Sequence, residues 1–110
     1  MSRFRVIFSR HFSEKLAKSE KDFQSWVENI LDQLAINPYV GKPLGTKWLR
    51  EKKFGKKRMY YLLYEEFSAV YLVGISEKKD QPETIALIKL KLNLFRSELE
   101  AILKGGISVP

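Results

Sequence analysis

The chain has 110 residues, of which 45% are hydrophobic and 30% are charged, and this composition is that of one globular domain. It contains no cysteine, which excludes disulfides and thiol chemistry and removes the commonest structural ligand of zinc. The formal net charge is +7. The apolar run at the N-terminus is too short for a signal peptide, and no stretch approaches the length of a membrane span. We therefore expect a cytoplasmic protein without membrane contacts.

The excess positive charge lies in one segment, residues 42–58. This segment holds eight lysines and arginines against one acid, Glu51, so its net charge of +7 equals that of the whole chain. Such a concentration of charge is typical of a surface that binds a polyanion, because neutralised phosphates release their counterions. Aromatic and aliphatic residues interrupt the segment, which favours a folded surface over a disordered basic tail. The alternative is a solvated face that only keeps the domain soluble.

The first part of the chain predicts a strand followed by two helices. The β-branched and aromatic run at 3–8 favours the strand. A short helix is expected over 10–18, and a longer one begins after Ser19 and ends at Asn37-Pro38. The apolar residues of the longer helix have the spacing of an amphipathic helix packed on a core: Phe23, Trp26, Val27, Ile30, Leu31, Leu34 and Ala35.

The middle of the chain predicts three short strands, at 48–53, 57–65 and 69–76. Because the connections between them are short, neighbouring strands are expected to be antiparallel and to form a meander. The last of the three is apolar throughout, so both of its faces are expected to be covered. The strand at 3–8 could join this sheet at its side.

The C-terminal part predicts one long helix over about 82–104. Apolar residues recur there at alternating steps of three and four, which is a heptad seam. Pro82 fits the first turn and Gly105-Gly106 fits the end. We expect the helix to pack on its own domain, and pairing with another chain is the alternative. The expected fold is thus α+β, in the order β-α-α-β-β-β plus this helix. An N-terminal strand and helical hairpin pack on a small antiparallel sheet, and a single domain spans 1–110.

Several short motifs, in their order and spacing, resemble the RelE/ParE superfamily, the toxin halves of type II toxin–antitoxin pairs. The resemblance covers about residues 4–90, and no single motif is diagnostic. The matching segments are Phe8-Ser9-Arg10-His11-Phe12, Asn37-Pro38, Gly41-Lys42-Pro43-Leu44, Trp48-Leu49-Arg50-Glu51, Arg58-Met59-Tyr60-Tyr61-Leu62-Leu63-Tyr64-Glu65 and Ile75-Ser76-Glu77-Lys78-Lys79-Asp80-Gln81. One departure is Tyr61, which stands where members commonly have an arginine. Arg58, three residues earlier, is expected on the opposite face of the strand.

The resemblance implies an endoribonuclease (an mRNA interferase) that cleaves messenger RNA on the ribosome without a metal or other cofactor. Such a toxin inhibits translation, arrests growth and has a cognate antitoxin as its partner, with which it could form a hetero-oligomer. The implied reaction is attack of a ribose 2′-hydroxyl on the neighbouring phosphate. That reaction needs a proton acceptor, cations around the phosphorane and a proton donor. Two alternatives stay open: a ParE-like inhibitor of DNA gyrase, and a non-catalytic module that binds nucleic acid or the antitoxin.

The chemistry would fall to lysine, arginine and tyrosine. The one histidine, His11, lies far in sequence from the basic strands, and we find no convincing set of metal ligands. Packed cations depress one another's pKa, so a lysine could act as the base, while arginines grip phosphate. Glu51 is either an internal partner for these cations or a proton acceptor. The candidate catalytic residues are Lys53, Arg58, Tyr61, Lys78 and Lys79, and the candidate RNA-binding residues are Arg50, Lys52, Lys56 and Lys57. We expect them to form a cationic groove at one end of the sheet.

Overall fold

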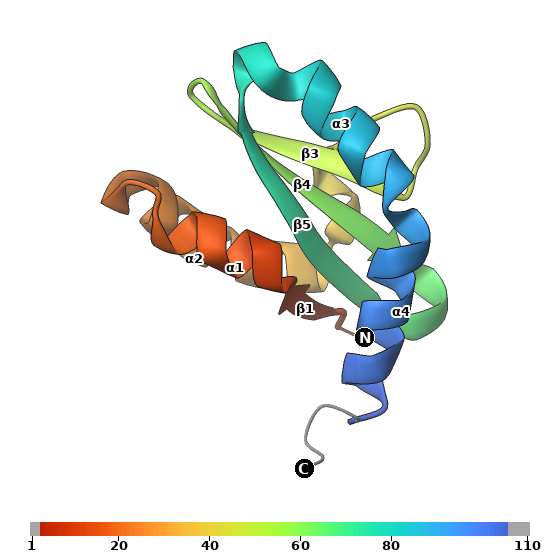
Figure 1. Ribbon diagram of the computed structural model, residues 1–110. Coiled ribbons are helices and arrows are strands. Elements are labelled where there is room, and N and C mark those ends of the chain that lie inside the picture. The colour runs from red at the N-terminus through yellow and green to blue at the C-terminus, as the bar shows by residue number, and fades with distance from the viewer. Residues whose placement is uncertain (1–2, 106–110) are drawn as a thin grey trace.

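The structure is a computed structural model, and it describes residues 3–105. Within these residues the chain forms one five-stranded sheet with two α-helices on each face (Figure 1). The strands are β1 (Arg5–Phe8), β2 (Lys42–Pro43), β3 (Leu49–Phe54), β4 (Lys57–Tyr64) and β5 (Ala69–Glu77). The helices are α1 (Arg10–Ala17), α2 (Lys21–Ile36), α3 (Gln81–Leu90) and α4 (Leu92–Leu103). None of the helices in the described range is long and apolar enough to cross a membrane.

The order of strands in the sheet is β1-β5-β4-β3-β2. β1 pairs with β5 in parallel, and every other pair is antiparallel. The α+β class, the antiparallel meander and the placement of the first strand at its side are therefore confirmed. The two-residue strand β2, which extends the sheet beyond β3, was not predicted from the sequence.

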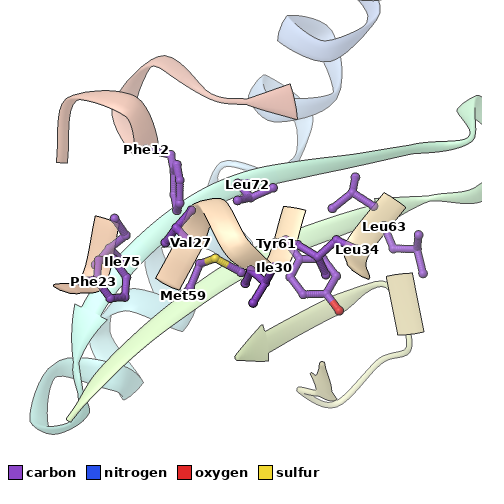
Figure 2. Close-up of a cluster of buried hydrophobic side chains, with 11 residues drawn as sticks. Phe12, Phe23, Val27, Ile30, Leu34, Met59, Tyr61, Leu63, Leu72 and Ile75 are labelled. Carbon is purple, nitrogen blue, oxygen red and sulfur yellow. The ribbon is translucent and has the colours of Figure 1, made fainter. Parts of the chain in front are cut away.

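Each face of the sheet has its own hydrophobic cluster, because successive side chains of β4 and β5 point to opposite faces. The cluster under α1 and α2 is shown in Figure 2 and consists of Phe12, Phe23, Val27, Ile30, Leu34, Met59, Tyr61, Leu63, Val70, Leu72 and Ile75. The cluster under α3 and α4 consists of Leu49, Tyr60, Leu62, Ala69, Tyr71, Val73, Ile88, Phe95 and Leu99. As predicted, both faces of β5 are covered: its side chains are buried from Ala69 to Ser76.

A β-bulge in β5 changes which side chains face α3. Tyr60 pairs with Gly74, but Tyr61 pairs with Leu72, so Val73 is the extra residue on β5. As a result Leu72 and Ile75 both face α2, although they lie three positions apart in the sequence. A Cβ on Gly74 would lie only 3.3 Å from Ile88 Cδ1, so the glycine allows α3 to lie close against the strand.

The C-terminal segment is helical as predicted, but it is two helices rather than one. Lys91 separates α3 from α4, with φ −104° and ψ 13°, and the two helices follow each other along the same face of the sheet (Figure 1). Their apolar seam packs on the domain's own sheet, since Ile88, Phe95 and Leu99 are buried there. α4 ends before Gly105, which has a φ of +72°. Gly106 and the rest of the tail lie outside the described residues.

Two buried polar side chains hold the loop between α2 and β3. Tyr61 donates its hydroxyl proton to Pro38 O at 2.7 Å and accepts from Gly41 N at 3.0 Å. A side chain at Gly41 would collide with that hydroxyl, because an added Cβ would lie 2.6 Å from it. Arg50, the register partner of Tyr61, donates to three backbone carbonyls of the loop at 2.8–3.0 Å. The loop is therefore fastened to the sheet by side chains rather than by strand pairing alone.

We expect Tyr61→Phe to lower the free energy of unfolding by about 1–3 kcal/mol, because a buried N–H and a buried carbonyl lose their partner. Urea unfolding followed by circular dichroism measures this. Tyr64→Phe is the matched control, because the Tyr64 hydroxyl makes no hydrogen bond within residues 3–105. Equal losses in the two variants would mean that the loop does not depend on Tyr61.

Candidate nucleic-acid interface

Two rows of polar side chains cross the α3 side of the sheet, near the turn between β3 and β4. In the first row, Lys42 is in register with Glu51 and Glu51 with Tyr60. In the second row, Lys53 is in register with Arg58 and Arg58 with Ser76. Register partners point to the same face of a sheet, and Tyr60 belongs to the cluster under α3 and α4. The cross-sheet site is therefore defined by Lys42, Glu51, Lys53, Arg58, Tyr60 and Ser76.

The centre of the cross-sheet site is a buried hydrogen-bonded set. Tyr60 Oη lies 2.9 Å from Ser76 Oγ, and Ser76 donates to Glu77 O at 3.0 Å. Burial raises the pKa of the Tyr60 hydroxyl above its ordinary value, so Tyr60 stays neutral at physiological pH. Glu51 is only 3% exposed, and its Oε1 accepts a hydrogen bond from the side chain of Gln81 at the start of α3. The buried carboxylate is thus held in place by the first residue of the covering helix.

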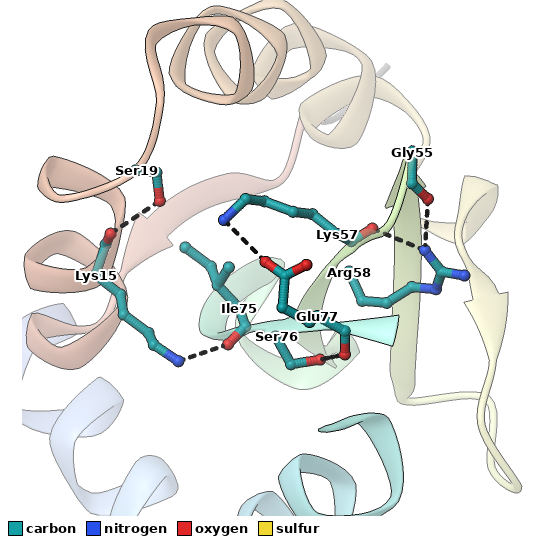
Figure 3. Close-up of polar contacts among 8 residues, drawn as sticks. All are labelled: Lys15, Ser19, Gly55, Lys57, Arg58, Ile75, Ser76 and Glu77. Carbon is teal, nitrogen blue, oxygen red and sulfur yellow. Dashed lines mark hydrogen bonds and ion pairs between the residues drawn. The ribbon is translucent and has the colours of Figure 1, made fainter. Parts of the chain in front are cut away.

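Arg58 is a buried cation whose hydrogen-bonding capacity is only partly used. It is 5% exposed, and its Nη1 donates to Gly55 O at 2.9 Å and to Lys57 O at 3.0 Å (Figure 3). Its Nε is buried without a hydrogen-bond partner in the described part of the chain. Leaving a donor of a buried cation unpaired is costly, so an anion beside this guanidinium would be stabilised.

Arg58 opens onto a basic groove of about 710 Å³ at the end of the sheet, lined by Gly55, Lys56, Arg58, Glu77, Lys78 and Lys79. Lys78 and Lys79 lie in the 3₁₀ turn that follows β5. That turn is attached to the β3–β4 turn, because Lys78 N donates to Lys56 O at 2.7 Å. Four cations thus line the groove, and Lys53 stands next to it as the register partner of Arg58.

The structure separates the remaining predicted site residues from this groove. Lys52 is in register with Met59, so it points to the α2 side. Lys57 also lies on that side, where its Nζ is 3.3 Å from the Glu77 carboxylate and 5.5 Å from the centre of the Phe23 ring. Of the predicted site residues, Lys53, Lys56, Arg58, Lys78 and Lys79 come together at the groove.

Two predicted site residues belong to the interior, and their assignments are corrected. Tyr61 is fully buried on the α2 side, so it cannot stack on a base or reach a phosphate. Arg50 is 8% exposed, and its guanidinium is occupied by loop carbonyls, so it is not free to grip phosphate. The expectation that Arg58 and Tyr61 point to opposite faces is confirmed.

Sequence reasoning did not propose Tyr60, Ser76 or Gln81 as parts of the site. Tyr60 and Ser76 share a face only because of the bulge in β5. The one signal for it was Gly74, since an isolated glycine in an apolar strand suggests a bulge or a close approach. Gln81 looked like part of a turn before the helix, and only the packing of α3 brings it to Glu51.

Comparison with solved structures identifies the fold. A double mutant of the E. coli toxin RelE in the free state superposes with a TM-score of 0.64 and 16% identity, over 80% of this chain and 99% of that chain. The RelBE2 toxin–antitoxin complex from Mycobacterium tuberculosis matches with a TM-score of 0.60 and 22% identity, over 70% of this chain and 93% of the matched chain. No protein-family model and no curated protein matches the sequence. The chain therefore has the fold of the RelE toxins.

The two faces of β3 provide a matched test of the interface. We expect Lys53→Ala to weaken binding of a single-stranded RNA severalfold. The slope of log affinity against log salt concentration should fall by about one, which corresponds to the loss of one phosphate contact. Lys52→Ala removes the same charge one residue away on the other face, so it should change binding much less. Fluorescence anisotropy over a range of salt concentrations measures both. Equal losses would mean that the α3 side of the sheet is not the interface.

Proposed function

We propose that this protein is the toxin of a type II toxin–antitoxin pair and that it cleaves messenger RNA on the ribosome. The observation on which this proposal rests most is the cross-sheet site, where a buried arginine with an unpaired donor opens onto a groove lined by lysines. The RelE fold supports the same assignment. Within the proposal the protein acts in the cytoplasm, where its ribosomal substrate is found.

The groove suits the charge that develops during cleavage. Attack of a ribose 2′-oxygen on the adjacent phosphorus forms a phosphorane with more negative charge than the starting diester. Arg58 and Lys53 lie side by side in register to stabilise that charge, and Lys78 and Lys79 line the same groove. Fixed cations in a partly buried site act more strongly than cations in bulk water.

Glu51 is the proton acceptor in this proposal; because it is 3% exposed beneath Gln81, it acts only when the start of α3 moves aside. It lies two residues before Lys53 on the same face of β3, which puts their Cα atoms about 7 Å apart. The 2′-hydroxyl proton passes to the Glu51 carboxylate as the oxygen–phosphorus bond forms. A lysine ammonium of the groove, Lys78 or Lys79, gives a proton to the 5′-oxygen as its bond to phosphorus breaks. The products are a 2′,3′-cyclic phosphate and a 5′-hydroxyl.

A cognate antitoxin is the proposed protein partner. The similar structures include RelE–RelB complexes from bacteria and from the archaeon Pyrococcus horikoshii OT3. The net charge of +7 favours a partner with an acidic surface. Such a partner, bound as a hetero-oligomer, would compete with RNA wherever it covers the groove.

Induced expression should arrest growth and produce new messenger 5′ ends. Arg58→Ala, and Lys78→Ala combined with Lys79→Ala, should each lower the cleavage rate by about 10²–10³-fold, because they remove cations that act on the phosphorane. Lys52→Ala, on the opposite face, should cleave at the normal rate. Sequencing of RNA ends after induction measures this, and urea unfolding verifies that each variant is folded.

The same experiment separates the other functions. Intact messengers together with inhibited gyrase supercoiling would assign the protein to gyrase inhibition and overturn cleavage. Undisturbed growth under strong expression, with RNA binding retained, would assign it to the non-catalytic module.

Glu51→Gln tests the proton acceptor. The amide is nearly isosteric with the carboxylate and can still accept from Gln81, so the fold should be retained. We expect cleavage to fall by about 10²-fold or more, because the proton of the 2′-hydroxyl loses its acceptor. RNA binding should be unchanged or slightly tighter, because a negative charge is removed. Normal cleavage by this variant would mean that another residue is the acceptor.

A further inference from the structure

The outer side of α3 and α4 has a row of exposed leucines. Leu87 is 54% exposed, Leu90 is 81% exposed and Leu94 is 53% exposed. They follow one another at steps of three and four residues, so they share one side of the two helices, which run along the sheet in Figure 1. We call Leu87, Leu90 and Leu94 the outer leucine row.

The fold itself does not account for this row. The sheet-facing side of α3 and α4 is supplied by other residues, among them Ile88, Phe95 and Leu99, which are 0–6% exposed. Single exposed leucines are common, but a contiguous apolar row on one helix face is typical of a surface that another molecule covers. Ser97 and Ala101 continue the row at the same spacing, and both are small and exposed. Their size allows a second helix to approach closely.

The charges beside the row indicate which molecule covers it. Lys89 and Lys91 flank Leu90, and both are exposed. Neither forms an ion pair with any residue of the described range. A second copy of this chain, paired about Leu90, would bring both lysines of each copy together and would add the repulsion between two chains of net charge +7. A helix with carboxylates beside its apolar seam would instead pair with these lysines.

We propose that the outer leucine row is the docking site of an acidic amphipathic helix from a partner protein. That helix presents aliphatic residues at heptad spacing and has Asp or Glu on the flanks of the seam. The row lies on the side of α3 and α4 that faces away from the sheet, whereas the cross-sheet site lies beneath α3. A helix docked on the row therefore leaves the basic groove open. Naming the antitoxin as the source of this helix rests on the proposed function, whereas the docking surface does not.

The test uses the whole chain and a synthetic probe. The probe is a 21-residue peptide with leucine at heptad positions a and d and glutamate at e and g, where like charges keep the peptide from pairing with itself. A matched peptide has lysine at e and g. We expect the acidic peptide to bind in fluorescence anisotropy and the lysine peptide to bind at least about tenfold more weakly.

Variants of the chain locate the binding. Leu90→Ser should weaken binding of the acidic peptide by about tenfold or more, because the most exposed leucine of the row no longer contributes apolar surface. Ile36→Ser is the matched control, since Ile36 is 56% exposed at the end of α2, outside the row. It should leave binding unchanged. Lys53→Ala should also have no effect, which distinguishes the row from non-specific attraction to the basic groove.

Three results would overturn the proposal: no binding of the acidic peptide, equal binding of the two peptides, or Leu90→Ser binding as tightly as the wild type. Sedimentation that finds a dimer of the chain, dissociated by Leu90→Ser, would assign the row to a second copy and also overturn it. The outcome is independent of the cleavage assay. Messenger cleavage without peptide binding contradicts only the docking site, and peptide binding without cleavage contradicts only the proposed function.

Discussion

The antiparallel pairing of β4 with β5 is the constraint on which both halves of the domain depend. The two strands lie inside the sheet, and each presents apolar side chains to both helical layers. Met59, Tyr61 and Leu63 face α2, while Tyr60 and Leu62 face α3 and α4. Any slip of one residue in this register would move each set to the wrong layer, so burial on both faces fixes the register firmly.

The bulge in β5 brings the polar residues of the cross-sheet site onto one face of β4 and β5. If β5 alternated regularly with all of its residues, Ile75 would face the α3 side and Ser76 would face the α2 side. With the bulge, Ser76 joins Tyr60, and Arg58 has a polar neighbour across the strand. The same alternation divides the basic segment, because Lys53 and Arg58 share one face while Lys52 and Lys57 share the other. Only some of the positive charges in the basic segment therefore lie at the cross-sheet site.

Local patterns predicted the elements well, since the spacing of α2 and the apolar run of β5 reflect burial that each element experiences by itself. The interruption at Lys91 left no such signal, because neither glycine nor proline stands there and the heptad spacing continues through it. The assignments of Arg50 and Tyr61 failed for a different reason. Their residue types fit phosphate binding, but backbone groups of the loop between α2 and β3 take up their hydrogen bonds, and this depends on how the folded loop lies against the sheet. A single sequence does not show which backbone groups a side chain will meet once the chain has folded.

α3 connects the two surfaces that the structure singles out. Its first residue, Gln81, holds the carboxylate of Glu51, and its inner side packs against Tyr60 and Gly74 through Ile88. Its outer side presents Leu87 and Leu90. Anything that binds the outer leucine row therefore acts on the helix that covers the cross-sheet site. A ligand shifts a conformational equilibrium by its difference in affinity for the two states. A partner that favours the packed position of α3 therefore keeps Glu51 buried. A partner that favours a displaced position of α3 exposes Glu51.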